Sequence, residues 1–229
     1  MIELESITKR FADGQRALTV LDGLSLRVDE GEFIAITGES GAGKTTLLNI
    51  LGTLVSPDEG RYLIRGKEAT PNPSDRGGST ETICQLRNKE IGFVYQDHRL
   101  LPQFTVLQNI LLPTLATKSD TTEEEEQRAI ELLEFMGIAA LKDRPVTQLS
   151  GGQQTRVAIC RALINQPAIL LADEPTGQLD AANAQTIATL FQRVNAQLHT
   201  TIIMATHSAE MAKVAQKTYL LAQGKLKEI

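Results

Sequence analysis

A glycine-rich stretch, GESGAGKTT, follows the apolar run FIAIT and precedes apolar residues at helical spacing. Its pattern, Gly-x-x-x-x-Gly-Lys-Thr, suits a phosphate-binding loop, because glycine lets successive N–H groups converge on one anion and the next helix adds its own. Lys44 would reach the β- and γ-phosphates, and the Thr45 hydroxyl would ligate Mg²⁺. A glycine-rich turn before a core helix is the plainer alternative. The residues expected to contact a nucleotide are Gly38, Glu39, Ser40, Gly41, Ala42, Gly43, Lys44, Thr45 and Thr46.

Two further apolar runs end in polar side chains. AILLADEP places Asp173 and Glu174 after one predicted strand, and TIIMATHS places His207 after another. Open α/β sheets bind ligands at the carboxyl ends of their strands. There Asp173 can hold Mg²⁺, Glu174 can orient and deprotonate an attacking water, and His207 can contact the γ-phosphate or that water. Solvated acids and a structural histidine are the alternatives.

A second glycine-rich stretch, LSGGQQTR, precedes the helical pattern RVAICRALINQ. Ser150, Gly151 and Gly152 could present a hydroxyl and backbone N–H groups to another anion. Ser150 could equally serve only as the N-cap of the helix. From these residues alone both interpretations stay open.

The elements that position these residues follow from the apolar pattern. FIAIT, AILLAD and TIIMAT are continuous apolar runs, as expected for strands buried on both faces of a parallel sheet. LTVLDGLSLRV alternates towards its end, which indicates a half-buried antiparallel strand. Helical patterns separate the runs: KTTLLNILGTL, and then ETICQLRNKE with a strand ending near Gln96. This order predicts an α/β layered domain. TPNPSDRGGST, Thr70 to Thr80, is a loop by composition.

From about Asp97 to Leu149 the pattern becomes helical. TTEEEEQRAIELLEFMG is an amphipathic helix in which Thr122 and Glu125 form a capping box and Gly137 provides the stop. Its four glutamates complement the helix dipole better than they suit a metal site. We expect a helical lobe, about residues 97–149, inserted in a single domain of residues 1–229. The apolar stripe is Ala129, Leu132, Leu133 and Met136.

Composition excludes several classes of function. The 229 residues carry a net charge of −5 with a pI of about 5.3, so no overall positive field attracts nucleic acid. Cys84 and Cys160 lack metal-site spacing, and Cys160 falls on an apolar helix face. We find no signal-peptide pattern and no apolar run long enough for a membrane span, so a cytosolic chain is expected.

Taken in order, GESGAGKT, the Gln96 of FVYQ, LSGGQ, ILLADE and His207 resemble the nucleotide-binding subunits of ABC transporters over almost the whole chain. The resemblance implies a P-loop NTPase core with a mostly parallel sheet, an N-terminal antiparallel β subdomain and an inserted α-helical lobe. It also implies an active ATPase that uses ATP and Mg²⁺. In this family Gln96 would sense the metal or the water, and Phe11 would stack on adenine.

The same resemblance implies a partner of the same kind. Two copies would form a head-to-tail dimer in which ATP bound to one phosphate loop is covered by the other subunit. The covering residues would be Ser150, Gly151, Gly152 and Gln153. GQLD, which ends at Asp180, is similar to the family's D-loop beside the nucleotide.

The segment from Leu86 to Leu115, LRNKEIGFVYQDHRLLPQFTVLQNILLPTL, resembles a subfamily that includes the lipoprotein-releasing ATPase LolD, MacB and FtsE. Such a subunit lies on the cytoplasmic face of the inner (cell) membrane and would dock an integral membrane permease near Gln96 to Leu115. Packing of the helical lobe is the alternative role for Leu100, Leu101 and Phe104. The docking candidates are His98, Arg99, Phe104 and Val106.

Three functions therefore remain open. The first is the ATPase of a lipoprotein-releasing complex. The second is a MacB-type efflux or FtsE-type cell-division ATPase of the same subfamily. The third is a soluble ABC ATPase of the iron–sulfur assembly type, against which the match over residues 97–115 argues.

Overall fold

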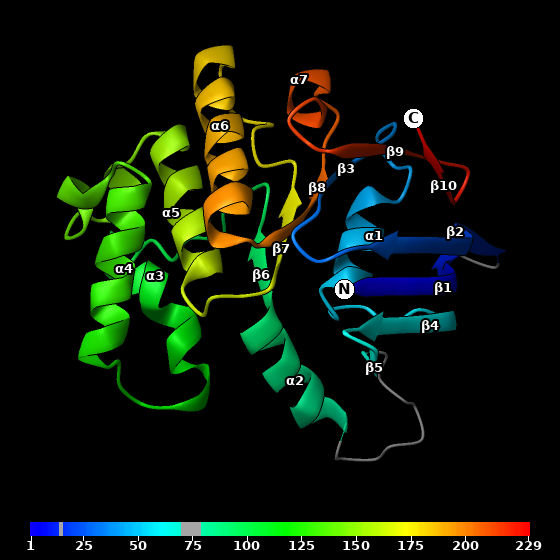
Figure 1. The fold of residues 1–229 in the computed structure, drawn as a ribbon, viewed down its shortest axis with the longest axis horizontal. Helices are drawn as coiled ribbons and strands as arrows, with labels where there is room; N and C mark the ends of the chain where they lie inside the picture. The colour runs from blue at the N-terminus through cyan, green and yellow to red at the C-terminus, as the bar shows by residue number, and fades with distance from the viewer. Residues whose placement is uncertain (14–15, 70–78) are drawn as a thin grey trace.

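Helix α1 (Lys44–Leu51) lies between two β-sheets in the computed structural model, which describes residues 1–13, 16–69 and 79–229 (Figure 1). The smaller sheet has the order β2-β1-β4-β5, and its strands pair antiparallel. Buried leucines of α1 share one core cluster with side chains from both sheets. The antiparallel strand predicted from LTVLDGLSLRV and the N-terminal antiparallel subdomain implied by the family resemblance are both confirmed. Its strands are β1 (Ile2–Asp13), β2 (Arg16–Val28), β4 (Glu59–Ile64) and β5 (Lys67–Glu68).

The larger sheet has the order β10-β9-β3-β8-β7-β6 and is parallel except for β10. The three continuous apolar runs form its neighbouring strands β3, β8 and β7, which pair parallel as predicted. Every residue of β7 and β8 is buried, because helices cover one face and α1 with the smaller sheet covers the other. The strands are β3 (Phe33–Thr37), β6 (Ile91–Val94), β7 (Ile169–Asp173), β8 (Thr201–Ala205), β9 (Lys217–Ala222) and β10 (Lys225–Glu228).

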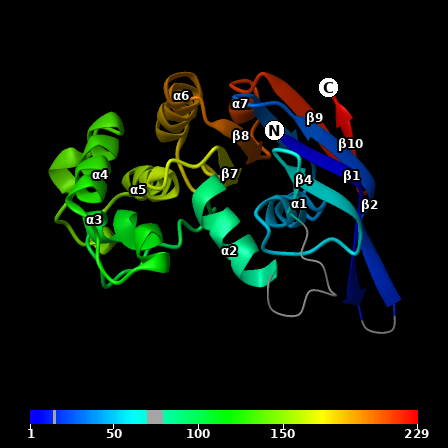
Figure 2. The same cartoon turned by 60° about the horizontal axis from the view of Figure 1, so that its bottom comes forward.

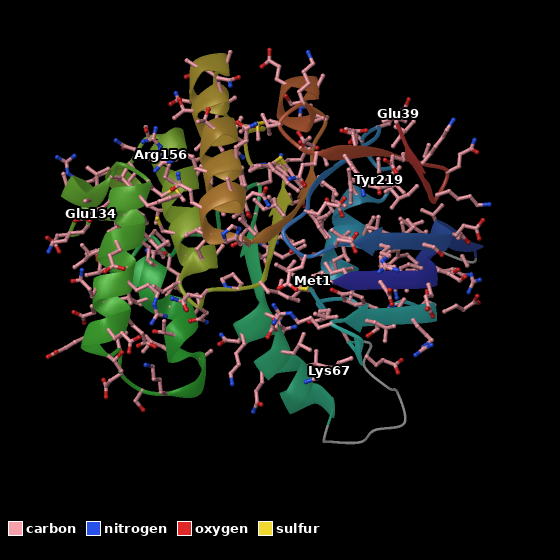
Figure 3. All side chains as sticks on the ribbon, viewed as in Figure 1. Met1, Glu39, Lys67, Glu134, Arg156 and Tyr219 are labelled. Atoms are coloured by element: carbon pink, nitrogen blue, oxygen red, sulfur yellow. The ribbon has the colours of Figure 1, made fainter. Side chains whose placement is uncertain are left out.

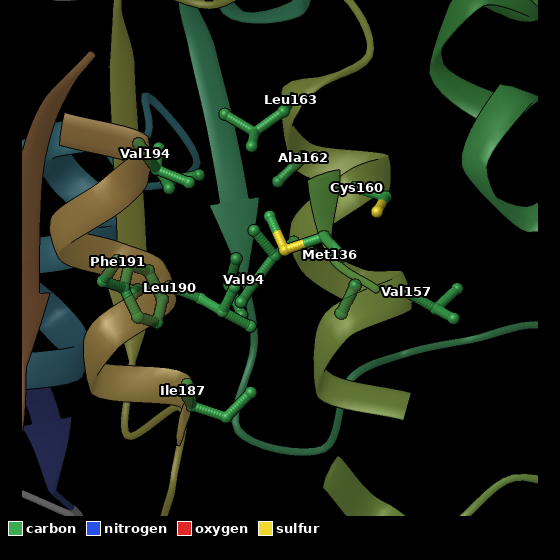
Figure 4. Close-up of a cluster of buried hydrophobic side chains, with 14 of the residues drawn as sticks. Val94, Met136, Val157, Cys160, Ala162, Leu163, Ile187, Leu190, Phe191 and Val194 are labelled. Atoms are coloured by element: carbon green, nitrogen blue, oxygen red, sulfur yellow. The ribbon is translucent and has the colours of Figure 1, made fainter. Parts of the chain in front are cut away.

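The face of the large sheet opposite to α1 is covered by three helices. They are α5 (Gly151–Leu163), α6 (Ala181–Leu198) and the short α7 (Ala209–Ala212). Figure 4 shows part of the core they build, with Val94 of β6 beside side chains of α5 and α6. Cys160 is fully buried there, as its place on the apolar helix face predicts, and burial raises the pKa of its thiol.

Residues 97–149 contain only helical elements and turns, apart from one isolated bridge between Thr105 and Pro145. Figures 1 and 2 both place α3 and α4 on the far side of α5 from the small sheet. The predicted capping box of Thr122 and Glu125 is present at α4. An inserted lobe within one domain of residues 1–229 remains our proposal. Its elements are α3 (Val106–Leu111), η1 (Leu112–Thr117), α4 (Glu123–Phe135), η2 (Ala139–Leu141) and η3 (Val146–Gln148).

Three boundaries differ from the sequence prediction. Helix α1 ends at Leu51 because the chain turns at Gly52, so Leu54 lies beyond the helix with 42% of its surface exposed. Strand β6 ends at Val94, two residues before Gln96. Of the loop predicted from Thr70 to Thr80, residues 70–78 lie outside the described residues, and helix α2 (Ser79–Glu90) already begins at Ser79. Within the described residues, no helix combines the length and apolar composition that crossing a membrane requires.

Candidate nucleotide-binding site

The segments after β3, β6, β7 and β8 meet at the carboxyl edge of the large sheet, together with parts of β1 and β2. They enclose a cavity of about 700 Å³. Parallel neighbours bring their carboxyl ends to one edge, so residues from distant parts of the chain converge there. The cavity collects most of the predicted nucleotide and catalytic residues. Its lining is Phe11, Val20, Ser40, Gly41, Gly43, Lys44, Thr45, Thr46, Gln96, Glu174 and His207.

The phosphate loop holds its own lysine in place. The Lys44 ammonium donates to the carbonyls of Gly38 and Glu39 at 2.8 and 3.0 Å, and the residue is only 8% exposed. Gly43 caps α1 in a left-handed conformation, with φ 103°. The Ala42 N–H donates to the Glu39 carbonyl, which closes a turn within the loop. Gly38, Glu39 and Ala42 therefore shape the loop, although they do not line the cavity. The arrangement presents a positive charge beside the free N–H groups of α1.

Gly38 lies against strand β9, and its replacement by Ala should destabilise the fold. A Cβ there would stand 2.5 Å from the Leu221 carbonyl oxygen, and the φ of 151° disfavours a side chain. We expect a loss of about 1–3 kcal/mol, which lowers the melting temperature by about 2–4 °C per kcal/mol. Gly41→Ala is the matched control, since its φ of 81° is also unfavourable but a Cβ would have open space. Equal melting temperatures for the two variants would contradict the predicted clash.

Glu174 is held in a strained conformation at the end of β7. Its φ is 45°, which is uncommon for a residue with a side chain, and its N–H donates to the Ala205 carbonyl of β8. One carboxylate oxygen lies 2.8 Å from Nδ1 of His207 and accepts from the His207 backbone N–H. The other lies 3.9 Å from the Lys44 ammonium. The carboxylate is therefore aimed into the cavity beside the lysine, where it can receive a proton from water.

Asp173 fits the second predicted role, that of holding a cation. The residue is buried, and its Oδ1 has no hydrogen-bond partner among the described residues. Burial raises the pKa of the Asp173 carboxyl, while a hydrogen bond from the Thr45 side chain opposes that rise. A buried carboxylate oxygen that lacks a donor and lies beside a hydroxyl suits a hard cation such as Mg²⁺. Thr45 and Gln96 line the nucleotide cavity, whereas Asp173 lies behind its lining residues.

Phe11 stands at the rim of the cavity on β1. It pairs with Leu18 of β2 and is 42% exposed, with the Lys9 ammonium 5.5 Å from the ring centroid. A large, exposed apolar ring at the edge of a phosphate site suits stacking on a purine. Sequence reasoning missed Val20, which lines the cavity and would touch a Cβ on Gly43 at 2.8 Å. Its strand pattern alone carried no signal for this contact.

The second glycine-rich stretch lies elsewhere in the same chain. The Ser150 hydroxyl accepts from the Gln153 N–H in a capping box, so the N-cap interpretation is correct. Asp180 similarly caps α6 through Asn183, whose side chain would be 3.0 Å from a Cβ on Gly152. In Figure 3, Glu39 of the phosphate loop and Arg156 of α5 lie far apart. The Ser150 to Gln153 group does not line the nucleotide cavity.

Two of the predicted docking residues are not on the surface. His98 is 5% exposed because its ring turns towards Thr155 of α5, and Val106 is fully buried in the lobe core. His98 and Val106 are therefore wrong as exposed docking residues. Arg99 and Phe104 are accessible at two different cavities. Leu101 is 37% exposed, while Leu100 packs against the core.

Arg99 lines a groove of about 510 Å³ that sequence analysis did not anticipate. The groove runs between α2, β6, η1 and α5. Helix α2 contributes Arg87 and Asn88, and α5 contributes Arg161. No acidic side chain lines the groove among the described residues, and Leu54 stands at its edge. Leu54 is exposed because α1 ends at Leu51. The apolar spacing predicted a helix through Leu54 and so assigned Leu54 to its apolar face, which is why its exposure at the groove was missed.

Residues 21–177 match the family model described as "ABC transporter". The chain belongs to this family. Among curated relatives of this ABC protein, "Lipoprotein-releasing system ATP-binding protein LolD" of Bacteroides fragilis (strain YCH46) is 42% identical over 99% of the chain and all of the relative. "Macrolide export ATP-binding/permease protein MacB" of Syntrophobacter fumaroxidans is 41% identical over 98% of the chain but only 31% of the relative.

Solved structures agree with this assignment. "Dimeric Structure of MJ0796, a Bacterial ABC Transporter Cassette" superposes with a TM-score of 0.88 and 36% identity, covering 100% of this chain and 98% of that one. A post-hydrolysis state of the same cassette, bound to ADP and Pi, gives the same TM-score at 35% identity, with the same coverage. The ABC protein described here is an ATP-hydrolysing transport subunit with the α/β fold of these cassettes.

Nucleotide binding should raise the stability of this ABC protein. ATP with Mg²⁺ at ~100 times its dissociation constant is expected to add about 2.7 kcal/mol to the free energy of unfolding. For a chain of this size that corresponds to a rise of about 5–10 °C in melting temperature. A thermal melt with and without Mg-ATP checks this, with Lys44→Ala as the variant that should respond weakly. An unchanged melting temperature at saturating ATP would contradict binding in the cavity.

Proposed function

We propose that this chain is the ATPase subunit of a lipoprotein-releasing complex on the cytoplasmic face of the cell membrane. The observation that carries the proposal is the end-to-end similarity to several lipoprotein-releasing ATP-binding proteins. In each of them the alignment takes in nearly the whole of both chains. That coverage favours the lipoprotein-releasing type over the other two candidate functions.

For hydrolysis we assign a role to each of three side chains that line the cavity, those of Lys44, Glu174 and His207. Lys44 exchanges the carbonyls of Gly38 and Glu39 for the β- and γ-phosphates of ATP, so it changes partners without leaving the loop. Glu174 takes the proton of the attacking water. His207 holds the Glu174 carboxylate through its ring and its backbone N–H and can reach the γ-phosphate.

Mg²⁺ would be held by Thr45, Asp173 and Gln96. When bound, the ion would neutralise charge on the phosphate oxygens. The support for this assignment is the buried Asp173 carboxyl, whose Oδ1 has no partner among the described residues while the Thr45 side chain donates a hydrogen bond to the group.

We further propose that two copies assemble head to tail. In that arrangement Ser150, Gly151, Gly152 and Gln153 of one copy cover the ATP of the other, and Asp180 lies near the same nucleotide. Within one chain these residues lie at a different cavity from the nucleotide residues, so they cannot cover the ATP of their own chain. This separation supports the proposal that they cover the ATP of a second copy. The dimeric cassette structures named above support it as well.

The permease is proposed to dock in the groove lined by Arg87, Arg99 and Arg161. The three guanidinium groups meet no acid among the described lining residues, and Asp97, 3.4 Å from Arg99, lies outside the lining, so the groove favours a cytoplasmic permease segment that carries a carboxylate. Leu54, exposed at the groove edge, offers an apolar contact to the same segment. The docking region predicted from the sequence spans Gln96 to Leu115. The proposed docking surface also includes residues of α2 and α5.

A pull-down tests the proposal. Tagged Glu174→Gln chain with Mg-ATP is incubated with detergent-solubilised membranes, and the bound proteins are identified. We expect an integral membrane protein with a large extracytoplasmic domain. Adding Arg87→Glu should abolish its capture, whereas Arg27→Glu on the exposed face of β2 should not. Recovery of soluble proteins alone, under several detergents, would overturn the transport proposal and favour the iron–sulfur assembly type.

An efflux role of the MacB type is the second candidate. The observation favouring it is the similarity to the MacB ATP-binding/permease protein, of which the chain spans only 31%. The same pull-down separates the two, because the type of extracytoplasmic domain on the captured permease differs between lipoprotein release and efflux. An FtsE-type partner would be recognised in the same way.

A further inference from the structure

Three hydrogen bonds tie the turn after Gln96 to helix α5. His98 Nε2 lies 2.8 Å from the Thr155 hydroxyl. The Arg161 guanidinium donates to the carbonyl of Arg99 at 2.6 Å and also to the carbonyl of His98. All three contacts join residues that lie far apart in the sequence, and two of the side chains come from the helix that begins at Gly151. We call this set of contacts the α5 clamp.

The turn that the clamp holds is strained. His98 and Arg99 are consecutive residues with left-handed φ angles of 58° and 47°. Residues with side chains adopt this conformation at a cost, and it persists when surrounding contacts fix it. The clamp supplies those contacts from one side. From the other side, the Arg99 guanidinium lies 4.0 Å from the ring centroid of Tyr95.

The hydroxyl of Thr155 extends the clamp to the start of α5. It donates to the Gly151 carbonyl at 3.0 Å. A hydroxyl has one proton to give, so both contacts are satisfied when the His98 Nε2–H donates to Thr155. A directed chain of hydrogen bonds then runs from His98 through Thr155 to Gly151. His98 is 5% exposed and Thr155 is fully buried, so water does not replace either bond at low cost.

We propose that His98 is a positioning residue that acts through Thr155 to fix the first turn of α5, and with it the surface that Ser150 and Gly151 present to a second copy. The proposal rests on the head-to-tail arrangement proposed above. The groove residues Tyr95, Arg99 and Arg161 belong to the clamp or contact it, so the same contacts connect the permease groove with the start of α5. Stabilising the lobe is the plainer role for a buried hydrogen bond, and the test separates the two.

The test measures ATP-dependent dimerisation in the Glu174→Gln background by sedimentation. Thr155→Val removes the hydroxyl at nearly constant shape, and His98→Leu removes the donor. Each is expected to weaken the ATP-bound dimer by about 5- to 150-fold, the usual range for coupling between sites. Binding of ATP to the single chain should change less than about twofold, because the clamp does not line the nucleotide cavity.

Three further variants make the result specific. Thr155→Ser keeps the hydroxyl and should restore the dimer. Thr189→Val is the matched control, since the Thr189 hydroxyl of α6 also donates to the carbonyl four residues earlier but is exposed and has no histidine beside it. The double variant His98→Leu with Thr155→Val should be no worse than the more affected single variant, because both remove the same bond.

Two outcomes would overturn the inference alone while the parent dimerises normally with ATP. One is a Thr155→Val protein that dimerises as well as Thr189→Val. The other is a double variant whose loss equals the product of the two single losses. A Glu174→Gln parent that stays monomeric at saturating Mg-ATP would overturn the head-to-tail proposal itself, and this inference with it.

Discussion

Replacing Glu174 with Gln is expected to lower the rate of ATP turnover by at least about 10²–10⁴-fold, the usual effect of removing a general base. Glutamine keeps the shape of the side chain and can still contact His207, but it cannot accept a proton from water. The phosphate loop and Lys44 are untouched by this change. ATP binding should therefore persist while hydrolysis nearly stops.

Turnover is measured as phosphate release at saturating Mg-ATP, with ATP affinity determined separately on the same protein. Glu134→Gln makes the same chemical change on an exposed residue of α4 and should turn over ATP normally. If the Glu174→Gln protein hydrolyses ATP at a rate near that of the parent, another group activates the water and our assignment of Glu174 is wrong.

Replacing Lys44 with Ala should weaken ATP binding by about 10- to 150-fold, because hydrogen bonds to charged groups contribute about 1.5–3 kcal/mol. The Lys44 ammonium is buried, and the loop carbonyls of Gly38 and Glu39 hold it in place before ATP arrives. The variant loses a fixed charge that needs little reorganisation to meet the phosphates.

Equilibrium binding of a fluorescent ATP analogue gives the affinity. Lys142→Ala, on the exposed surface of the helical lobe, is the control for loss of one positive charge from the whole chain. If Lys44→Ala binds the analogue as tightly as the parent does, Lys44 does not contact the phosphates, and the assignment of the phosphate loop is wrong.

The parts of the site that sequence could predict are those carried by short local patterns. The loop around Lys44 and the acids after β7 follow continuous apolar runs, and such runs become buried parallel strands with their carboxyl ends at one edge. The capping box at Thr122 and the cap at Ser150 are also local, since each joins residues three apart in the sequence.

The parts that sequence could not predict depend on distant partners. His98 follows an exposed glutamine and an exposed aspartate, and nothing near it indicates burial. Its environment is set by Thr155 and Arg161, which lie 57 and 63 residues away. The basic groove likewise draws on α2, η1 and α5, none of which carries a charge pattern that points to the others.

The strand order of the large sheet determines how late during synthesis on the ribosome β3 can pair with its neighbours. Strand β3, which leads into the phosphate loop, pairs only with β8 and β9, and both lie after residue 200. At about 5–20 residues per second, roughly 8–34 s pass between the synthesis of Thr37 and that of Ala205, the last residue of β8. During that time β3 is an apolar segment without either sheet neighbour. A nascent chain cut short before β8 therefore cannot form the nucleotide cavity, and its unpaired strand is a segment for chaperones to shield.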